Sequence, residues 1–371
     1  MCGRFGSARL LLTGIRLRPP LRTFPMPDTD NHAGTDSGYP DNPILVRVWR
    51  GAEVESVHRG AWVLVDPDGG VIEGAGAFES PIFARSTVKA LQALPLFETG
   101  AADRYSFGPQ QTALAISSHN AEPCHTDIVR AMLERLDLGE EHLRCGAQVP
   151  GDRDTRWRML RADEKPTSLH NNCSGKHAGF LTLSRFFEEE PASYLDVASQ
   201  VQSRVRKAVT EMCGLSADEL VVAIDGCSAP TFRMPLDNLA LGFARLTNPD
   251  KLDSDRANWC RVLQDSVAAH PELVAGTAGR IDTDISRATK GRLFPKVGAE
   301  AVYVIGEIDG GRALAVKMDD GGLRGMHRLI IGLIEKLGMA SGEELEQLER
   351  WRNPIVKNFA GLEVGHEEVL V

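Results

Sequence analysis

Three short segments containing serine and lysine occur in a fixed order along this chain, and their side chains could carry out nucleophilic catalysis. They are Ser86-Thr87-Val88-Lys89, Ser118-His119-Asn120 and Lys296-Val297-Gly298. A serine hydroxyl is a weak nucleophile, and a neighbouring lysine activates it when burial or a second cation lowers the lysine pKa toward neutrality. Ser86 and Lys89 are three residues apart near an expected helix start, so they share a helix face. The Ser86 N–H there could donate to an oxyanion.

Each segment is a weak signal alone, because Ser-x-x-Lys occurs by chance in many proteins. The alternatives are a solvated helix lysine at Lys89, an ordinary polar turn at 118–120 and a surface lysine at Lys296. Together, the three segments are similar in order to the S-x-x-K, S-x-N and K-x-G motifs of serine β-lactamases and penicillin-binding proteins. This order favours amide-bond hydrolysis over a binding module.

The elements that must position these segments predict an α+β fold. Strands are expected at both ends of the chain, over 44–49, 60–65, 71–73, 301–306 and 313–317. Helices are expected over 81–94, 124–137, 176–187, 193–213, 255–269 and 326–337, with Ser80-Pro81 as the N-cap and first residue of the first helix. The pattern predicts a central antiparallel sheet of N- and C-terminal strands, flanked by helices, with a helical insertion at about 122–290. That is a serine β-lactamase-like architecture.

Composition narrows the class of protein further. The chain is 42% hydrophobic and carries a net charge of −9, so its surface repels nucleic acid and anionic membranes. Its seven cysteines are odd in number and scattered, which indicates reduced thiols and a cytoplasmic location. No apolar run reaches the roughly 20 residues of a membrane helix. Residues 1–42 are expected to be disordered or an extension before a second start at Met26, and residues 43–371 to form a single domain.

Four segments resemble the Rhizobium-type, or class 3, L-asparaginases, often called asparaginase II. They are 84–89 (ARSTVK), 117–122 (SSHNAE), 170–177 (HNNCSGKH) and 225–230 (DGCSAP), and the third is the most specific. The resemblance covers about residues 43–365. It implies a β-lactamase-like fold, a homodimer, and hydrolysis of L-asparagine to L-aspartate and ammonia. The acidic composition indicates that neither nucleic acid nor a membrane is a partner.

The resemblance also implies roles for individual residues. Ser86 with Lys89 would form one Ser–Lys pair, and Ser118 with Lys296 a second. We expect Ser86 to attack the side-chain amide with Lys89 as its base, while Ser118 remains an open alternative as nucleophile. Arg85 and Asp225 are candidates to hold the α-carboxylate and α-amino groups of the substrate, since guanidinium binds carboxylate in bidentate fashion and carboxylate binds ammonium. His119 and Asn120 are further substrate-binding candidates.

The family further implies a zinc ion held by Cys173, Lys176 and a second cysteine, which we place in the stretch 279–283. This chain has Asp282 there. Carboxylate is an acceptable but harder zinc ligand. Weak zinc binding, another cation, and a metal-free Lys176–Asp282 ion pair are the alternatives, and we favour the ion pair. Cys173 could also be a buried, inert thiol. No phosphate-binding or dinucleotide-binding glycine pattern supports a nucleotide cofactor.

Two other functions remain open at this stage. Fold does not fix substrate, so a glutaminase or another amide hydrolase could use the same residues. A catalytically silent amino-acid-binding protein is the alternative from a different class, and the presence of both serines and both lysines argues against it.

Overall fold

The computed structural model describes residues 41–308 and 310–371, and contacts group Pro40–Val371 into one compact unit. The expected N-terminal extension, residues 1–42, therefore lies almost wholly outside the described residues. No helix within the described ranges is long and apolar enough to cross a membrane.

An eight-stranded antiparallel sheet forms the centre of this unit. Its strands are β1 (Ile44–Arg50), β2 (Glu53–Val65), β3 (Val71–Ala75), β7 (Leu293–Val297), β8 (Val302–Glu307), β9 (Ala313–Met318), β10 (Ile355–Lys357) and β11 (Glu363–Val369). The order is β10-β11-β1-β2-β9-β8-β7, and β3 pairs with β2. The N-terminal strands therefore meet the C-terminal ones, β1 with β11 and β2 with β9. The predicted α+β class, with a sheet built from both ends of the chain, is confirmed.

Side-chain alternation along β2 divides the core between the two faces of the sheet. Ala61, Val63 and Val65 belong to one buried cluster, together with residues of the helices α1 (Lys89–Glu98) and α8 (Leu236–Thr247). Trp62 and Leu64 belong to the other, with residues of the helices α11 (Ile281–Ala288) and α12 (Met326–Lys336). Successive residues of a strand point to opposite faces, so β2 contributes to both clusters. The sheet is consequently covered by helices on each side.

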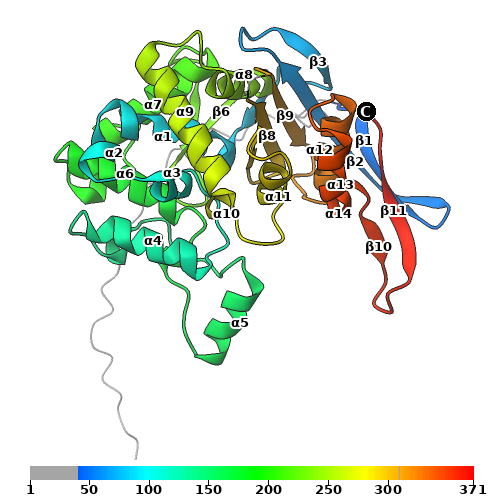
Figure 1. Ribbon diagram of the computed structural model, residues 1–371, viewed down its shortest axis with the longest axis horizontal. Coiled ribbons are helices and arrows are strands. Elements are labelled where there is room, and N and C mark those ends of the chain that lie inside the picture. Colours follow the sequence, from blue (N-terminus) through cyan, green and yellow to red (C-terminus); the bar gives the residue numbers. More distant parts are fainter. Residues whose placement is uncertain (1–40, 309) are drawn as a thin grey trace, which may run out of the picture. The chain divides into compact units, whose positions relative to one another are not determined.

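Most helices lie between β3 and β7 in the sequence. They are α1 (Lys89–Glu98), α2 (Ala101–Arg104), α3 (Pro109–Ala115), α4 (Pro123–Glu134), α5 (Arg153–Arg161), α6 (Ser174–Phe186), α7 (Gln200–Cys213), α8 (Leu236–Thr247), α9 (Ser254–Ala269), α10 (Pro271–Val274) and α11 (Ile281–Ala288). Three more follow the sheet strands: α12 (Met326–Lys336), α13 (Gly342–Gln347) and α14 (Glu349–Arg352). Figure 1 shows the cyan-to-yellow helices gathered away from β1 and β11.

The segment that carries the first motif differs from the prediction. Instead of one helix over 81–94, the chain forms β4 (Pro81–Phe83), a 3-10 helix over Arg85–Val88, and then α1. The strand β4 joins a small second sheet in the order β4-β6-β5, with β5 at Val221–Ile224 and β6 at Pro230–Pro235. Proline lacks an N–H but tolerates the first position of an edge strand, which is where Pro81 lies. The predicted N-cap at Ser80 was therefore wrong.

Candidate active site

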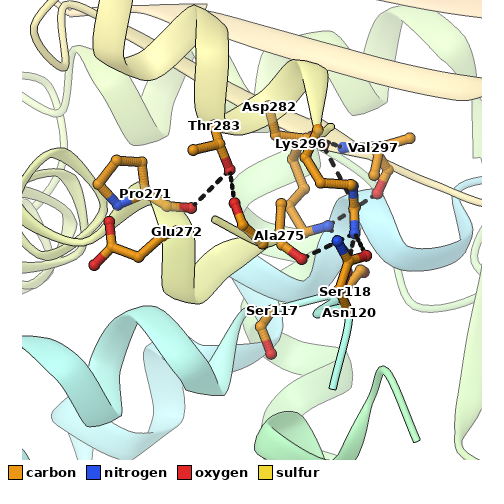
Figure 2. Close-up of polar contacts among 12 residues, drawn as sticks. Ser117, Ser118, Asn120, Pro271, Glu272, Ala275, Asp282, Thr283, Lys296 and Val297 are labelled. Atoms are coloured by element: carbon orange, nitrogen blue, oxygen red, sulfur yellow. Dashed lines mark hydrogen bonds and ion pairs between the residues drawn. The ribbon is translucent and has the colours of Figure 1, made fainter. Parts of the chain in front are cut away.

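Two buried lysines meet at the hydroxyl of Ser118. Lys89 Nζ and Lys296 Nζ each lie 3.0 Å from Ser118 Oγ. Lys89 is the first residue of α1, Lys296 is on β7, and Ser118 lies in the loop after α3. Lys89 also donates to the Ser117 carbonyl at 2.6 Å, and Lys296 to the Val297 carbonyl at 2.9 Å. Figure 2 shows the Lys296 side chain reaching toward Ser118. The structure thus brings three of the four expected catalytic residues into direct contact.

Ser86 lies beside this cluster rather than at its centre. It is in the 3-10 helix over Arg85–Val88, three residues before Lys89, and is partly exposed. Among the hydrogen bonds of the described residues, the Lys89 ammonium bonds to Ser118 and not to Ser86. Ser118 is only 6% exposed. Ser86 is therefore the serine open to solvent, while Ser118 connects the two lysines.

Burial and the neighbouring Lys89 affect the charge of Lys296. Lys89 and Lys296 are each 1% exposed. Burial, and then the nearby positive charge of Lys89, lower the pKa of Lys296 to about 7. A lysine that loses its proton near neutral pH can act as a general base, which an ordinary lysine cannot. The site therefore contains a base positioned to accept a proton from the Ser118 hydroxyl.

Arg85 and Asp225, the expected substrate-binding residues, are paired with each other. Arg85 Nε donates to Asp225 Oδ1 at 2.7 Å, and the backbone N–H of Gly226 donates to the same oxygen at 2.9 Å. Burial opposes ionisation of Asp225, but the charges of Lys176 and Arg85 hold its pKa below the usual value. Arg85 has φ of 52°, a left-handed conformation that is costly for a residue with a Cβ. Such strain is often found at functional sites.

The other two expected substrate-binding residues, His119 and Asn120, have partners within the protein. The Ala121 N–H donates to His119 Nδ1 at 3.0 Å, so His119 Nε2 carries the proton and donates to Ser174 Oγ at 2.9 Å. Burial strongly lowers the pKa of His119, which keeps the ring neutral. Asn120 Oδ1 accepts from Arg280 Nη1 at 2.8 Å. Both side chains therefore fix the shape of the Ser118 loop.

Asp282 does not join Cys173 and Lys176, so the expected Lys176–Asp282 ion pair is wrong. Asp282 lies in the first turn of α11, where Oδ1 accepts from the Val297 N–H at 2.8 Å and Oδ2 faces Arg280 at 3.5 Å. Figure 2 shows Asp282 beside Val297. Because α11 packs on the end of β7, its first turn faces Lys296 and not the start of α6.

The partner of Lys176 is instead Cys227, from the turn between β5 and β6. Lys176 Nζ lies 3.2 Å from Cys227 Sγ, and Lys89 Nζ lies 3.1 Å from Cys173 Sγ. The Cys173 thiol hydrogen-bonds to Cys227 and, with Lys176, lowers the pKa of Cys227. That bond and burial raise the pKa of Cys173. A thiolate at Cys227 is the form that binds metal.

These donors fit a soft cation better than the set containing Asp282. Two thiols and one amine converge at Cys173, Cys227 and Lys176, and thiolate sulfur is a preferred zinc ligand. No group of three His, Cys, Asp or Glu side chains that could hold a metal occurs within residues 41–308 and 310–371. Lys176 is the third protein donor beside the two thiols at this place.

Sequence reasoning missed two residues of this site, Cys227 and Arg280. Cys227 stands in the segment 225–230, which carried the family resemblance, but was not given a role. Arg280 Nη1 donates to Ser118 O, Asn120 Oδ1 and Ala275 O at 2.8–2.9 Å. No local pattern marks an arginine that bridges two loops, so only the structure could reveal this role.

Comparisons of the chain with known proteins identify a matching family. A family profile described as L-asparaginase II matches residues 46–369. No curated protein matches the chain. Mglu, in a crystal structure of its native form in the presence of 4.3 M NaCl, is similar with 12% identity and a TM-score of 0.39. That match covers 76% of this chain and 63% of Mglu, so the chain spans less than two thirds of the Mglu length. A β-lactamase from Mycobacterium bovis is similar with 15% identity and a TM-score of 0.38, covering 75% of this chain and 94% of that chain.

Proposed function

The chain belongs to the L-asparaginase II family, and from this premise we propose that it hydrolyses the side-chain amide of L-asparagine to L-aspartate and ammonia. The observation that carries the proposal is the convergence of Lys89 and Lys296 on Ser118 Oγ, each at 3.0 Å, in a buried site. Amide hydrolysis needs a proton acceptor at neutral pH, and the lowered pKa of Lys296 supplies one.

Ser86 is the nucleophile in this proposal, because it is partly exposed and follows Arg85 directly. Neutral Lys296 accepts a proton from the Ser118 hydroxyl, and Ser118 takes one from the Lys89 ammonium. Lys89, now neutral, removes the proton of Ser86 as its oxygen attacks the amide carbon. The covalent intermediate splits one difficult displacement into two easier ones.

The leaving group needs a proton as the intermediate collapses. Lys89, protonated by Ser86 in the first step, donates that proton to the amide nitrogen, so ammonia leaves and an ester to Ser86 remains. The same lysine then takes a proton from the attacking water and returns it to Ser86 Oγ as the ester bond breaks, so aspartate is released and the Ser86 hydroxyl is restored. The backbone N–H of Ser86, in the first turn of the 3-10 helix, is the proposed donor to the oxyanion.

Arg85 and Asp225 bind and orient the substrate in this proposal. The Nη atoms of Arg85, of which Nη1 lies 3.9 Å from Glu300 Oε1, bind the α-carboxylate, and Asp225 binds the α-ammonium while it keeps its bond to Arg85 Nε. A substrate that carries both an α-carboxylate and an α-ammonium would therefore bind to Arg85 and Asp225 together, without breaking the ion pair between them. Cys173, Lys176 and Cys227 would hold a zinc ion, which would supply Lewis-acid chemistry to the site.

The alternative nucleophile is Ser118, and one observation favours it, namely its direct contact with both lysines. Ammonia release by Ser86→Ala and Ser118→Ala variants, with mass spectrometry of protein quenched during turnover, separates the two. We expect Ser86→Ala to abolish the ester-linked adduct of aspartyl mass and Ser118→Ala to slow its formation. An adduct on Ser118 in the wild-type protein would reverse the assignment.

Homodimerisation and a cytoplasmic location complete the proposal. The described cysteines, Cys124, Cys145, Cys173, Cys213, Cys227 and Cys260, are all free thiols. That supports a reducing compartment. Light scattering of the purified protein should give twice the mass of the chain, and a monomer at all concentrations would contradict the dimer.

A further inference from the structure

Arg280 and Asp282 connect the two halves of the Ser118–Lys296 contact, although neither touches Lys296 or the Ser118 hydroxyl. Arg280 precedes α11 and Asp282 lies in its first turn. Arg280 Nη1 donates to the Ser118 carbonyl at 2.9 Å and to Asn120 Oδ1 at 2.8 Å, so it holds the Ser118 loop on both sides of His119. The same nitrogen donates to the Ala275 carbonyl at 2.9 Å, which ties this loop to the end of α10.

Asp282 holds the Lys296 side of this contact. Its Oδ1 accepts from the backbone N–H of Val297 at 2.8 Å, and Val297 is the residue after Lys296 at the end of β7. Asp282 is 3% exposed, and its Oδ2 faces Arg280 Nη2 at 3.5 Å. A buried carboxylate is costly unless it is paired and hydrogen-bonded, and both conditions are met here. Figure 2 shows the dashed contacts of Asp282 and Lys296 with Val297, and the dashed contacts that end on Asn120 and Ala275.

We propose that Arg280 and Asp282, the Arg280–Asp282 brace, are positioning residues that set the separation between the Ser118 hydroxyl and the Lys296 amine. The inference rests on the proposed function in that it assigns the brace to the same reaction. It gives Asp282 a role different from the metal ligand expected from the sequence. The brace bonds to the backbone at each end, at the Ser118 carbonyl and at the Val297 N–H. The side chains of Ser118 and Lys296 therefore extend from fixed backbone positions.

Charge gives the brace a second effect, which a purely structural residue would lack. The titratable and charged groups that face Lys296 are Lys89 from α1, Cys173 before α6, and Arg280 and Asp282 at the start of α11. Burial is the largest influence and lowers the pKa of Lys296, as do Lys89 and Arg280, whereas Asp282 and Cys173 raise it. Removing the Asp282 charge must therefore make Lys296 lose its proton at lower pH.

Asp282→Asn is the informative variant, because asparagine keeps an oxygen that accepts from the Val297 N–H and loses only the charge. Asp284→Asn is the matched control. Asp284 is on the same helix and also accepts a partly buried hydrogen bond. Its donor is Trp351 Nε1, at 2.7 Å from Asp284 Oδ2, and not a residue next to Lys296. Asp282→Ala removes both the charge and the acceptor, and Arg280→Lys cannot reproduce three bonds from one guanidinium nitrogen.

Two readouts keep the brace separate from the proposed function. The first is the NMR titration of Lys296 in protein with 13C-labelled lysine, assigned with Lys296→Met, which needs no activity. We expect Asp282→Asn to move the Lys296 titration to lower pH by about one unit, and Asp284→Asn to leave it in place. Coincident titrations of wild type and Asp282→Asn, or an equal shift in Asp284→Asn, would overturn the proposal.

The second readout is ammonia release from L-asparagine. Asp282→Ala and Arg280→Lys should lower kcat about 10- to 100-fold with KM within about twofold of wild type, because the brace does not touch substrate. Asp282→Asn should recover most of that kcat and shift the acid limb of the pH profile to lower pH. A rise in KM with unchanged kcat would overturn the positioning role. An inactive wild-type protein whose Lys296 titration still shifts in Asp282→Asn would refute the proposed function and support the brace.

Discussion

Replacing Lys296 by methionine is expected to stabilise the protein at low pH while it abolishes turnover. Lys296 is 1% exposed, and burial, followed by the charge of Lys89, lowers its pKa from 10.5 to about 7. Methionine has a similar length and no charge, so it occupies the same space without the cost of burying an ammonium group. The residue that provides the proposed base is therefore also one that destabilises the fold.

The size of this effect follows from the pKa. One pKa unit is worth about 1.4 kcal/mol, so the lowering corresponds to roughly 5 kcal/mol against protonated Lys296 in the folded state. Between the two pKa values the unfolded chain holds the proton and the folded protein does not, so the stability contribution of Lys296 rises with pH. Below the folded-state value, Lys296 is protonated in both states and the whole penalty applies. Linkage gives a penalty of about 5 kcal/mol at pH 6 and about 2 kcal/mol at pH 9.

Urea unfolding of the wild type and Lys296→Met at pH 6 and pH 9 measures this difference. The two hydrogen bonds of the Lys296 nitrogen are lost at both pH values, at a cost of about 1–3 kcal/mol that largely cancels in the comparison. The gain in free energy of unfolding should be larger at pH 6 by about 3 kcal/mol. Lys165→Met, at an exposed lysine, is the control and should show no such pH dependence. An equal effect of Lys296→Met at both pH values would refute the lowered pKa.

Three further predictions concern the site and its support. Because Lys296 must be neutral to act, kcat/KM for L-asparagine should rise with pH through about 7, and a flat profile across that range would count against a lysine base. After dialysis against zinc, Cys227→Ser should retain much less of the metal than the wild type, whereas Asp282→Asn should retain as much, as measured by elemental analysis. The opposite result would restore Asp282 as a ligand. Gly175→Ala should lower the free energy of unfolding by about 2–4 kcal/mol, because the new Cβ would lie 2.2 Å from the Leu114 carbonyl oxygen, and unchanged urea midpoints would contradict that close packing.

The sequence predicted the fold well where the signal was local. The strands expected over 60–65 and 71–73 correspond to the C-terminal half of β2 and to β3. In the turn between them, Asp66 Oδ1 accepts from the N–H groups of Asp68 and Gly70 at 2.8 and 2.9 Å. Periodicity also placed α4, α6, α9 and α12 to within two residues at each end, except for the C-terminus of α4. The hairpin of β10 and β11 was missed, because Glu363–Val369 alternates weakly and contains three glutamates. Its pairing with β1 is a long-range contact that no local pattern indicates.

The candidate site was predictable in its residue types but not in its pairings. Motif order identified Lys89, Ser118 and Lys296, yet the contact of Lys89 with Ser118 depends on how α1 lies against the loop after α3. The cysteine beside Cys173 was expected in the stretch 279–283 and is instead Cys227. Sequence spacing cannot show which of two distant turns reaches the start of α6, because that depends on where the turn between β5 and β6 lies in the folded chain.

Ammonia release from L-asparagine and L-glutamine, measured side by side on wild type and on Ser86→Ala, is the most direct test of the proposed function. We expect release from L-asparagine by the wild type and its loss in Ser86→Ala, with unchanged thermal unfolding of the variant. Release mainly from L-glutamine would keep the Ser–Lys chemistry and change the substrate. No release from either amide, with zinc added or withheld, would contradict the proposed function.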